Sequence, residues 1–299
     1  MINRIDIIGL GAVGAMYADY YTEKLGADHV RILADRGRID RYRSEGIYIN
    51  GEKKDFPLCV AEDEKTPSEL LCFATKYGGL KAAIETVRHL VDEHTVIFAI
   101  INGIRSEEEL SAAFGAEKVI YCTAQKMDAK KELNQVTYST IGDLTLGITK
   151  DGAPERLSAL TEFLDRAGFP YTIAENVQKA LWSKLICNVG VNQAVAYYNG
   201  TYETVQVPGE PRDLMRRGML ECAAVAGAEG IDLTEKDVDA WISVIDRLTP
   251  ESEPSMQQDH KAGRKTEVEL FAGTVCSLGR KHGIETPVND LYLQFFTKD

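Results

Sequence analysis

The sequence lacks the features that staple small secreted proteins or bind structural zinc. Its six cysteines are scattered and include no CxxC pair. Its five histidines lie far apart, and no group of cysteines and histidines has the spacing of zinc ligands. Isolated cysteines of this kind are typical of reduced core residues in a cytoplasmic protein. We therefore expect neither a disulfide framework nor a metal site.

Positive charge and long apolar runs are also scarce. The chain has 34 Lys+Arg against 46 Asp+Glu, a formal net charge of −12. Nucleic acids and anionic membranes attract positive surfaces, so this balance excludes a general binder of either, but leaves room for a pocket that holds one phosphate. No apolar run approaches the roughly 20 residues that span a bilayer, and the start of the chain has no signal-peptide pattern. We expect a cytoplasmic protein.

The first half of the chain alternates short apolar runs with helical patterns. At 299 residues and 44% hydrophobic content, the chain can form one large domain or two ordinary ones. Strands separated by helices indicate βαβ units and a parallel sheet, with a mixed or antiparallel end. The predicted strands are Ile5–Ile8, Val30–Ala34, Leu70–Thr75, Thr95–Ile101, Val119–Gln125, Val136–Ser139, Asp143–Ile148 and Tyr171–Ala174, and the helices among them are Ala12–Leu25, Leu80–Leu90 and Pro154–Ala167.

Strand patterns disappear after Ala174, and long helical patterns replace them. The predicted helices are Asn176–Val189, Pro211–Ala228, Glu235–Leu248, His260–His282 and Asn289–Phe296. The sequence therefore predicts an α/β domain over residues 1–174 and an all-α domain over residues 175–299. A nucleotide-binding sheet followed by helices is a common layout of two-domain dehydrogenases.

A GxGxxG pattern directly follows the first strand and opens a helix. Its residues are Gly9, Leu10, Gly11, Ala12, Val13 and Gly14. The first glycine permits a tight turn, the second allows backbone to approach a pyrophosphate, and the third lets helix and strand pack closely. The free N–H groups of the helix N-terminus then favour the anion. Glycine turns also occur without a ligand, but the surrounding βαβ pattern favours a dinucleotide site.

The second strand ends beside residues that choose between two dinucleotides. An acid at this position binds the ribose 2′-OH of NAD, whereas an arginine holds the 2′-phosphate of NADP. The sequence offers both, as Asp35 and Arg36, and Arg38 and Arg41 follow. The arginines can equally form the solvated face of the next helix.

Two further strands end beside polar residues, Lys76 and Asn102. Ligands of open α/β sheets lie beyond the carboxyl ends of the strands, where either side chain could meet a cofactor or substrate. Asn102-Gly103 is equally a common turn dipeptide.

Lys184, Asn188 and Asn192 recur at every fourth position of an otherwise apolar helical segment. They share one stripe of a helix that we expect to be buried. A buried lysine shifts its proton affinity downward or finds a partner, and a lysine so tuned is a competent general acid. The alternative is a lysine whose stem lies on apolar surface while its ammonium reaches water.

These segments together resemble the ketopantoate reductases (2-dehydropantoate 2-reductases). The likeness runs from the glycine loop through Lys76, Asn102-Gly103 and the Lys184 helix to Ser255-Met256, Asp259, Thr266-Glu267 and Gly283–Pro287. It implies a Rossmann-type domain followed by a helical bundle like that of 6-phosphogluconate dehydrogenase. It also implies NADPH as cofactor and a branched 2-keto acid as substrate, while Asp35 leaves NAD possible. The apolar helical half of the chain predicts a homodimer.

The resemblance also implies roles for individual residues. Lys184 would protonate the ketone oxygen, and Glu267 would hydrogen-bond the developing hydroxyl and orient Lys184. Asn188, Asn192 and Ser255 would bind the substrate, while Asn102 and Lys76 would lie by the nicotinamide and the substrate. Ser255 and Glu267 would be about 18 Å apart on one continuous helix, so we expect the helix to begin near Asp259 and residues 254–258 to fold back.

The expected activity is the reduction of 2-dehydropantoate to pantoate on the pathway to pantothenate. A reductase of another branched 2-keto acid or of an opine-type substrate is one alternative. A dinucleotide-binding redox sensor without turnover is another, although a sensor has no need of a lysine paired with a carboxylate.

Overall fold

A computed structural model describes residues 1–298, which form two compact units, Met1–Val177 and the chain from Gln178 onward. Among these residues no helix is both long and apolar enough to cross a membrane. All six cysteines are free thiols, four of them buried.

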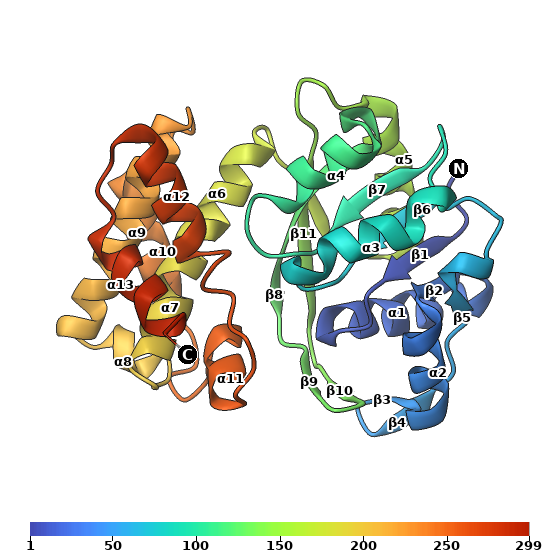
Figure 1. Cartoon of the computed structure of the whole chain (residues 1–299), viewed down its shortest axis with the longest axis horizontal. Helices are drawn as coiled ribbons and strands as arrows, with labels where there is room; N and C mark the ends of the chain where they lie inside the picture. The colour runs from blue at the N-terminus through green and yellow to red at the C-terminus, as the bar shows by residue number, and fades with distance from the viewer. Residues whose placement is uncertain (299) are drawn as a thin grey trace. The chain divides into compact units, whose positions relative to one another are not determined.

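The first unit is built on a sheet of eight strands with helices on both faces (Figure 1). The strands lie in the order β12-β11-β8-β7-β6-β1-β2-β5, and they are parallel except for the β8–β11 pair, which is antiparallel. Their bounds are β1 Ile5–Ile8, β2 Val30–Ala34, β5 Leu58–Val60, β6 Leu70–Phe73, β7 Val96–Ala99, β8 Val119–Met127, β11 Ile141–Gly147 and β12 Tyr171–Ile173. The helices are α1 Ala12–Leu25, α2 Arg36–Glu45, α3 Leu80–Val87, α4 Ser106–Phe114 and α5 Pro154–Ala167.

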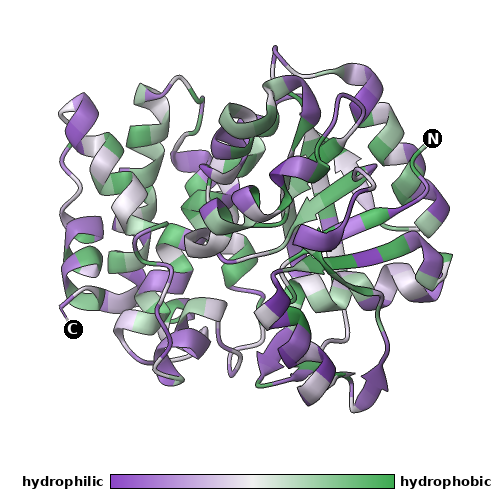
Figure 2. Ribbon diagram, turned by 45° about the vertical axis from the view of Figure 1, so that its right-hand side comes forward, coloured by the Kyte–Doolittle hydropathy of each residue, from purple (hydrophilic) through white to green (hydrophobic). Residues whose placement is uncertain are grey.

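The central strands are buried along their whole length, which explains their nearly continuous apolar sequences. Every residue of β1, β2, β6 and β7 is buried, and Figure 2 shows hydrophobic residues concentrated in the sheet. Helices α3 and α4 pack together on one face, and right-handed crossovers place α1 on the other. The Tyr20 hydroxyl of α1 donates to the carbonyl oxygens of Ala167 and Gly168 at the end of α5.

A second, small sheet lies against α1. Its strands are β3 Ile47–Ile49, β4 Glu52–Lys54, β9 Lys130–Glu132 and β10 Gln135–Thr137, in the order β4-β3-β10-β9. The prediction that Val136–Ser139 extends the large sheet is wrong, because β10 pairs with β3 and β9 instead. Two strands of this sheet, β4 and β9, contain only lysine and glutamate. They therefore show no alternation of apolar and polar residues from which a strand could be predicted.

The second unit is helical, so the predicted order of an α/β fold and then an all-α fold is confirmed. Its elements are α6 Val177–Cys187, which begins at the boundary of the first unit, a π-helical turn at Asn188–Asn192, α7 Gln193–Tyr197, α8 Glu203–Gln206, α9 Glu210–Ala228, α10 Glu235–Ile245, α11 Ser255–Lys261, α12 Ala272–His282 and α13 Pro287–Phe296.

The predicted helix His260–His282 is wrong, because α11 ends at Lys261 and α12 begins at Ala272. Gly263 reverses the chain with φ +61°, a backbone conformation that glycine adopts without strain. The Arg264 side chain then donates to Asp259 Oδ1 at 2.8 Å and closes the turn. The expectation that the helix begins near Asp259 is also wrong, since α11 begins at Ser255.

Candidate active site

Four neighbouring strands of the first unit end beside the residues predicted to hold a cofactor. Strands β7, β6, β1 and β2 are adjacent and parallel, so their carboxyl ends share one edge of the sheet. Asn102, Lys76, the loop Gly9–Gly14 and Asp35-Arg36 follow these strands in that order. The direction of the chain across the sheet reverses between β1 and β6, and such a switch point is where open α/β sheets bind ligands.

Two glycines of the loop are required by the protein's own packing. A Cβ on Gly9, whose φ is +102°, would lie 2.8 Å from the backbone of Ala74, just after β6. A Cβ on Gly14 would lie 2.0 Å from the Gly9 carbonyl oxygen. Both contacts are closer than real Cβ atoms approach, so α1 can meet β1 and β6 only if these residues lack side chains.

Gly11 is different, because the protein leaves room for a side chain there. The nearest atom to a Cβ at this position is the Ala74 carbonyl oxygen, 3.8 Å away. Gly11 is exposed and is the N-cap of α1, where no side chain caps the helix and no acid occupies the first turn. The N-terminal N–H groups of α1 are thus available to an anion. These residues fit the diphosphate of a dinucleotide.

Asp35 and Arg36 lie at the end of β2 as predicted, but each has a partner. Asp35 caps α2, accepting from the Arg38 backbone N–H at 2.8 Å, and its other oxygen pairs with the Arg38 guanidinium at 2.9 Å. The Arg36 guanidinium donates to both oxygens of Asp63 at 2.8 Å. Asp63 first, and then Asp40 and Glu62, raise the pKa of Arg36.

The other two predicted residues of this edge lie in loops. Lys76 is exposed and begins a short 3-10 turn, Tyr77–Gly79. Asn102 is half-buried, and Gly103 after it has φ +94°. The turn interpretation of Asn102-Gly103 therefore describes the backbone, while the Asn102 side chain stays a candidate for ligand binding.

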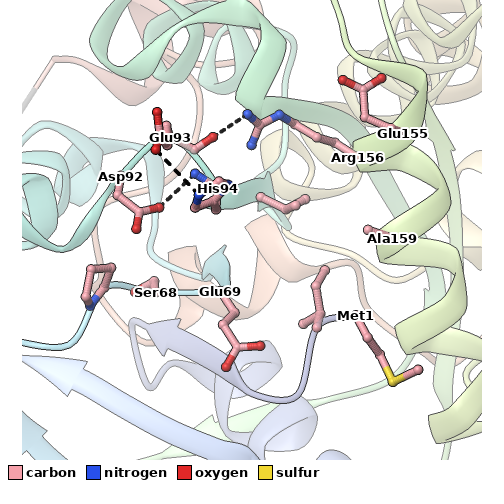
Figure 3. A pocket seen from close by; sticks show the side chains of 12 residues that line it. Met1, Ser68, Glu69, Asp92, Glu93, His94, Glu155, Arg156 and Ala159 are labelled. Carbon is pink, nitrogen blue, oxygen red and sulfur yellow. Dashed lines mark hydrogen bonds and ion pairs between the residues drawn. The ribbon is translucent and has the colours of Figure 1, made fainter.

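A pocket of this unit opens at the opposite edge of the sheet. Its lining includes Ser68 and Glu69, which precede β6, and Asp92–His94, which precede β7 (Figure 3). The Arg156 guanidinium, also in its lining, donates to the Glu93 carbonyl oxygen at 2.6 Å. None of the predicted site residues lines this pocket, and the amino-terminal edge of a parallel sheet is not where such folds bind nucleotides.

In the second unit, Lys184, Asn188 and Asn192 lie along α6 and the π-helical turn. Asn188 and Asn192 are buried, with 9% and 7% of their surface exposed. Lys184 is half-buried, not buried as predicted, because α6 keeps a partly exposed stripe that also contains Ala180, Ser183 and Cys187. π-helical turns inside α-helices are frequent at functional sites.

Asn188 carries a buried donor without a hydrogen-bond partner among the described residues. The Asn192 amide donates to Asn188 Oδ1 at 3.4 Å, but Asn188 Nδ2 donates to nothing. An unsatisfied buried donor costs roughly 1–3 kcal/mol. A carboxylate or hydroxyl oxygen of a ligand would satisfy it.

The remaining predicted residues are Ser255, at the start of α11, and Glu267, in the segment between α11 and α12. Ser255 is exposed and is the first residue of α11. Glu267 is half-buried, and its carbonyl oxygen accepts from the N–H groups of Leu270 and Phe271 in the turn before α12. Ser255 and Glu267 therefore do not share one continuous helix, and the distance that such a helix would impose between them does not apply.

Gln193, which was not predicted from the sequence, connects this turn to the π-helical segment. Gln193 is fully buried, its Oε1 accepts from the Ala272 N–H at 3.0 Å, and its Nε2 donates to the Val189 carbonyl oxygen at 2.8 Å. The segment that carries Glu267 is therefore fastened to the helix that carries Asn188 and Asn192. A glutamine after the Asn192 position in an apolar segment is the only sequence sign of it.

Comparison with known proteins places the chain by sequence and by fold. A protein called 2-dehydropantoate 2-reductase from Aquifex aeolicus is 28% identical over 100% of this chain and 96% of its own length. One of the same name from Halobacterium salinarum is 26% identical, over 95% of each.

Solved structures of similar fold include proteins of two different names. The 2-dehydropantoate 2-reductase of Geobacter metallireducens has a TM-score of 0.85 and 25% identity over 99% of both chains. A ternary structure of D-mandelate dehydrogenase with NADH and anilino(oxo)acetate has a TM-score of 0.88 and 20% identity, over 99% of this chain and 97% of the other, a likeness of fold.

The family is decided by the match of both halves of the chain. Residues 5–151 match the family described as Ketopantoate reductase PanE/ApbA, and residues 176–298 match the one described as Ketopantoate reductase PanE/ApbA C terminal. A glycine loop at a switch point, a helical second unit and these two matches lead to one conclusion: the chain belongs to the ketopantoate reductase family.

Proposed function

We propose that this protein reduces 2-dehydropantoate to pantoate with NADPH, as a cytoplasmic homodimer on the pathway to pantothenate. The observation that carries the proposal is the uncapped start of α1 behind Gly11, where the protein leaves room that its own packing does not need. The substrate follows from the relatives named 2-dehydropantoate 2-reductase, which align with nearly the whole chain. A dimeric ketopantoate reductase of Staphylococcus aureus, with TM-score 0.80, supports the homodimer.

The first unit would bind the cofactor at the carboxyl edge of its sheet. The residues Gly9, Leu10, Gly11, Ala12, Val13 and Gly14 would hold the diphosphate on backbone N–H groups. Asp35 would accept from the adenosine ribose, or Arg36 would contact a phosphate on it. Lys76 and Asn102 would lie beside the nicotinamide. The chemistry that a bound nicotinamide dinucleotide supplies is hydride donation to the carbonyl carbon.

The second unit would bind and protonate the keto acid. Asn188 Nδ2, buried and without a partner among residues 1–298, would donate to the substrate's carboxylate or hydroxyl, together with Asn192 and Ser255. Lys184 would give a proton to the ketone oxygen as negative charge develops there, and proton donation of this kind contributes about 10²–10⁴-fold in rate. Glu267 would accept a hydrogen bond from the new hydroxyl and orient Lys184.

The experiment is cofactor oxidation, followed by near-ultraviolet absorbance, with each of two cofactors and a panel of keto acids. The panel is ketopantoate, 2-ketoisovalerate, pyruvate, oxaloacetate and phenylglyoxylate. A kcat/KM for ketopantoate with NADPH well above every other combination is the expected result. Binding of cofactor without oxidation by any keto acid would leave a sensor, or an opine-type substrate outside the panel.

A second candidate is an NADH-dependent reductase of a different 2-keto acid. The D-mandelate dehydrogenase structures, which contain NADH, favour it by fold, and so does the acid Asp35 at the end of β2. Fast oxidation of NADH with phenylglyoxylate, and slow oxidation with ketopantoate, would select this candidate.

A further inference from the structure

Two lysines, Lys54 and Lys131, lie on the face of the small sheet that packs against α1, and only Lys54 forms ion pairs with acids. Side chains directly opposite in paired strands share a face. Lys131 pairs with Val136, Val136 pairs with Ile49, and both apolar residues are buried. Lys54 is opposite Ile47 on this face, and its ammonium has acids at 3.1 Å (Asp19), 3.3 Å (Glu23) and 3.5 Å (Glu52).

Lys131 has a carbonyl oxygen as its partner instead of an acid. Its Nζ donates to the Leu10 carbonyl oxygen at 2.6 Å, inside the glycine loop. Between residues 1 and 298, no carboxylate lies within ion-pair distance of this ammonium. Burial lowers the pKa of Lys131 and the charge of Arg41 lowers it further, while the charge of Glu45 acts in the opposite direction without cancelling the shift. A half-buried cation beside a second cation is an arrangement that an incoming anion would stabilise.

Arg41 is the second cation, and it is the exception among the arginines of α2. Arg36 pairs with Asp63, Arg38 with Asp35 and Arg43 with Asp40. Arg41 forms no ion pair with any described residue, and its guanidinium lies 5.5 Å from the centroid of the Tyr42 ring. The Lys131 ammonium lies 6.0 Å from the centroid of the same ring.

We propose that Lys131 and Arg41 form the subsite for the phosphate on the adenosine ribose of NADPH. The inference rests on the proposed dinucleotide site. In such a site, the loop that contains Leu10 and helix α2 flank the adenosine ribose. Two cations that form no ion pair with any described residue fit a dianionic phosphate, and an arginine and a lysine supply directional donors to its oxygens. Arg36 already forms an ion pair with Asp63 and also feels the negative charge of Asp40 and Glu62, so it is less suited to this role.

The test measures binding and needs no turnover. Isothermal titration gives dissociation constants of NADPH and NADH for the unmodified protein and for Lys131→Gln, Arg41→Gln and Arg36→Gln. Lys130→Gln is the matched control, because Lys130 is the exposed neighbour on the same strand. Adenosine 2′,5′-bisphosphate and adenosine 5′-monophosphate, which differ only in the 2′-phosphate, separate this phosphate from the diphosphate of the cofactor.

Loss of a charge-assisted hydrogen bond should weaken NADPH about tenfold or more in Lys131→Gln and in Arg41→Gln, with NADH changed less than about twofold. Adenosine 2′,5′-bisphosphate should follow NADPH, and Lys130→Gln should resemble the unmodified protein. Arg36→Gln should weaken NADPH less than Lys131→Gln or Arg41→Gln does. Lys131→Arg, which keeps the charge, should retain most of the affinity and serves if Lys131→Gln folds poorly.

Equal weakening of NADPH and NADH by Lys131→Gln would overturn the assignment. It would show that the ammonium contacts the diphosphate, which both cofactors share, or that it only holds the glycine loop in place. Unchanged affinities in both variants, or selective loss in Arg36→Gln alone, would also overturn it. If the unmodified protein bound neither dinucleotide, the proposed function itself would fail, a result distinct from these.

Discussion

Two regions bury polar side chains in apolar surroundings and treat them in opposite ways. At the amino-terminal ends of the strands, Asp6 accepts from Arg31 Nε at 2.9 Å, from the Ser68 hydroxyl at 2.6 Å and from Arg4 Nε at 3.0 Å. In the π-helical turn, the buried Asn188 amide has no acceptor in the described chain. The first region is satisfied within the protein, whereas the second contains a donor that a ligand could satisfy.

The two regions differ in whether their buried polar side chains are satisfied within the protein or are available to a ligand. Asp6 is fully buried and Arg31 is 6% exposed, yet each finds partners within the protein. A buried group that is satisfied internally stabilises the fold but offers nothing to a substrate. Substitutions in the first region should therefore change stability alone, and substitutions in the second should change catalysis alone.

The largest expected effect is on stability, from Arg31→Met. Removing this guanidinium leaves the buried Asp6 carboxylate without its main partner, which costs about 3–5 kcal/mol of unfolding free energy. Urea titration measures the loss, and NADPH affinity should be unchanged. Arg88→Met, which breaks an exposed pair with Glu85, is the matched control and should cost less than about 1 kcal/mol. A similar cost for both variants would show that burial of the ion pair has no special effect.

Next in size is Lys184→Ala, which should reduce kcat about 10²-fold or more and leave the unfolding midpoint and NADPH affinity nearly unchanged. The reason is loss of the group proposed to protonate the ketone oxygen. Steady-state kinetics give kcat, and Lys179→Ala, on the same helix with Asp237 at 4.0 Å, is the charge-matched control. Near-normal turnover in Lys184→Ala would remove Lys184 from the mechanism.

The smallest effect is expected from Asn188→Leu. This side chain of similar size has no donor, so kcat/KM should fall about tenfold through a lost hydrogen bond to substrate. The free protein should be about as stable as before, because removal of the unsatisfied amide donor offsets the loss of the acceptor for the Asn192 amide. Kinetics and urea titration together decide it. Lower stability with unchanged kcat/KM would show that Asn188 is a structural residue, like Asp6 and Arg31, and does not bind substrate.

Sequence patterns located the parts of the fold that are decided by local physics. Strands Ile5–Ile8 and Val30–Ala34 and helix Ala12–Leu25 have the bounds expected from their apolar runs and glycine punctuation. The strand Lys130–Glu132 could not be found this way, because it is held by pairing with β10 and by packing near α1. The break between α11 and α12 depends on Gly263 and on the Arg264–Asp259 contact, which are tertiary features of a segment with helical composition.

The candidate site divides along the same line. The glycine loop and the Asn188–Asn192 segment were visible as spacings in the sequence. Lys131 was not, because it is far from the loop in sequence and reaches Leu10 only through the small sheet. Gln193 was not either, because its importance lies in bonds to Ala272 and Val189 that no spacing reveals.

The most direct test of the account follows one atom. The protein is incubated with ketopantoate and NADPH carrying deuterium at the reactive position of the nicotinamide ring, and the product is analysed by mass spectrometry. The account predicts pantoate that carries one deuterium at the former carbonyl carbon. Absence of labelled pantoate, in a preparation shown to bind NADPH, would contradict it.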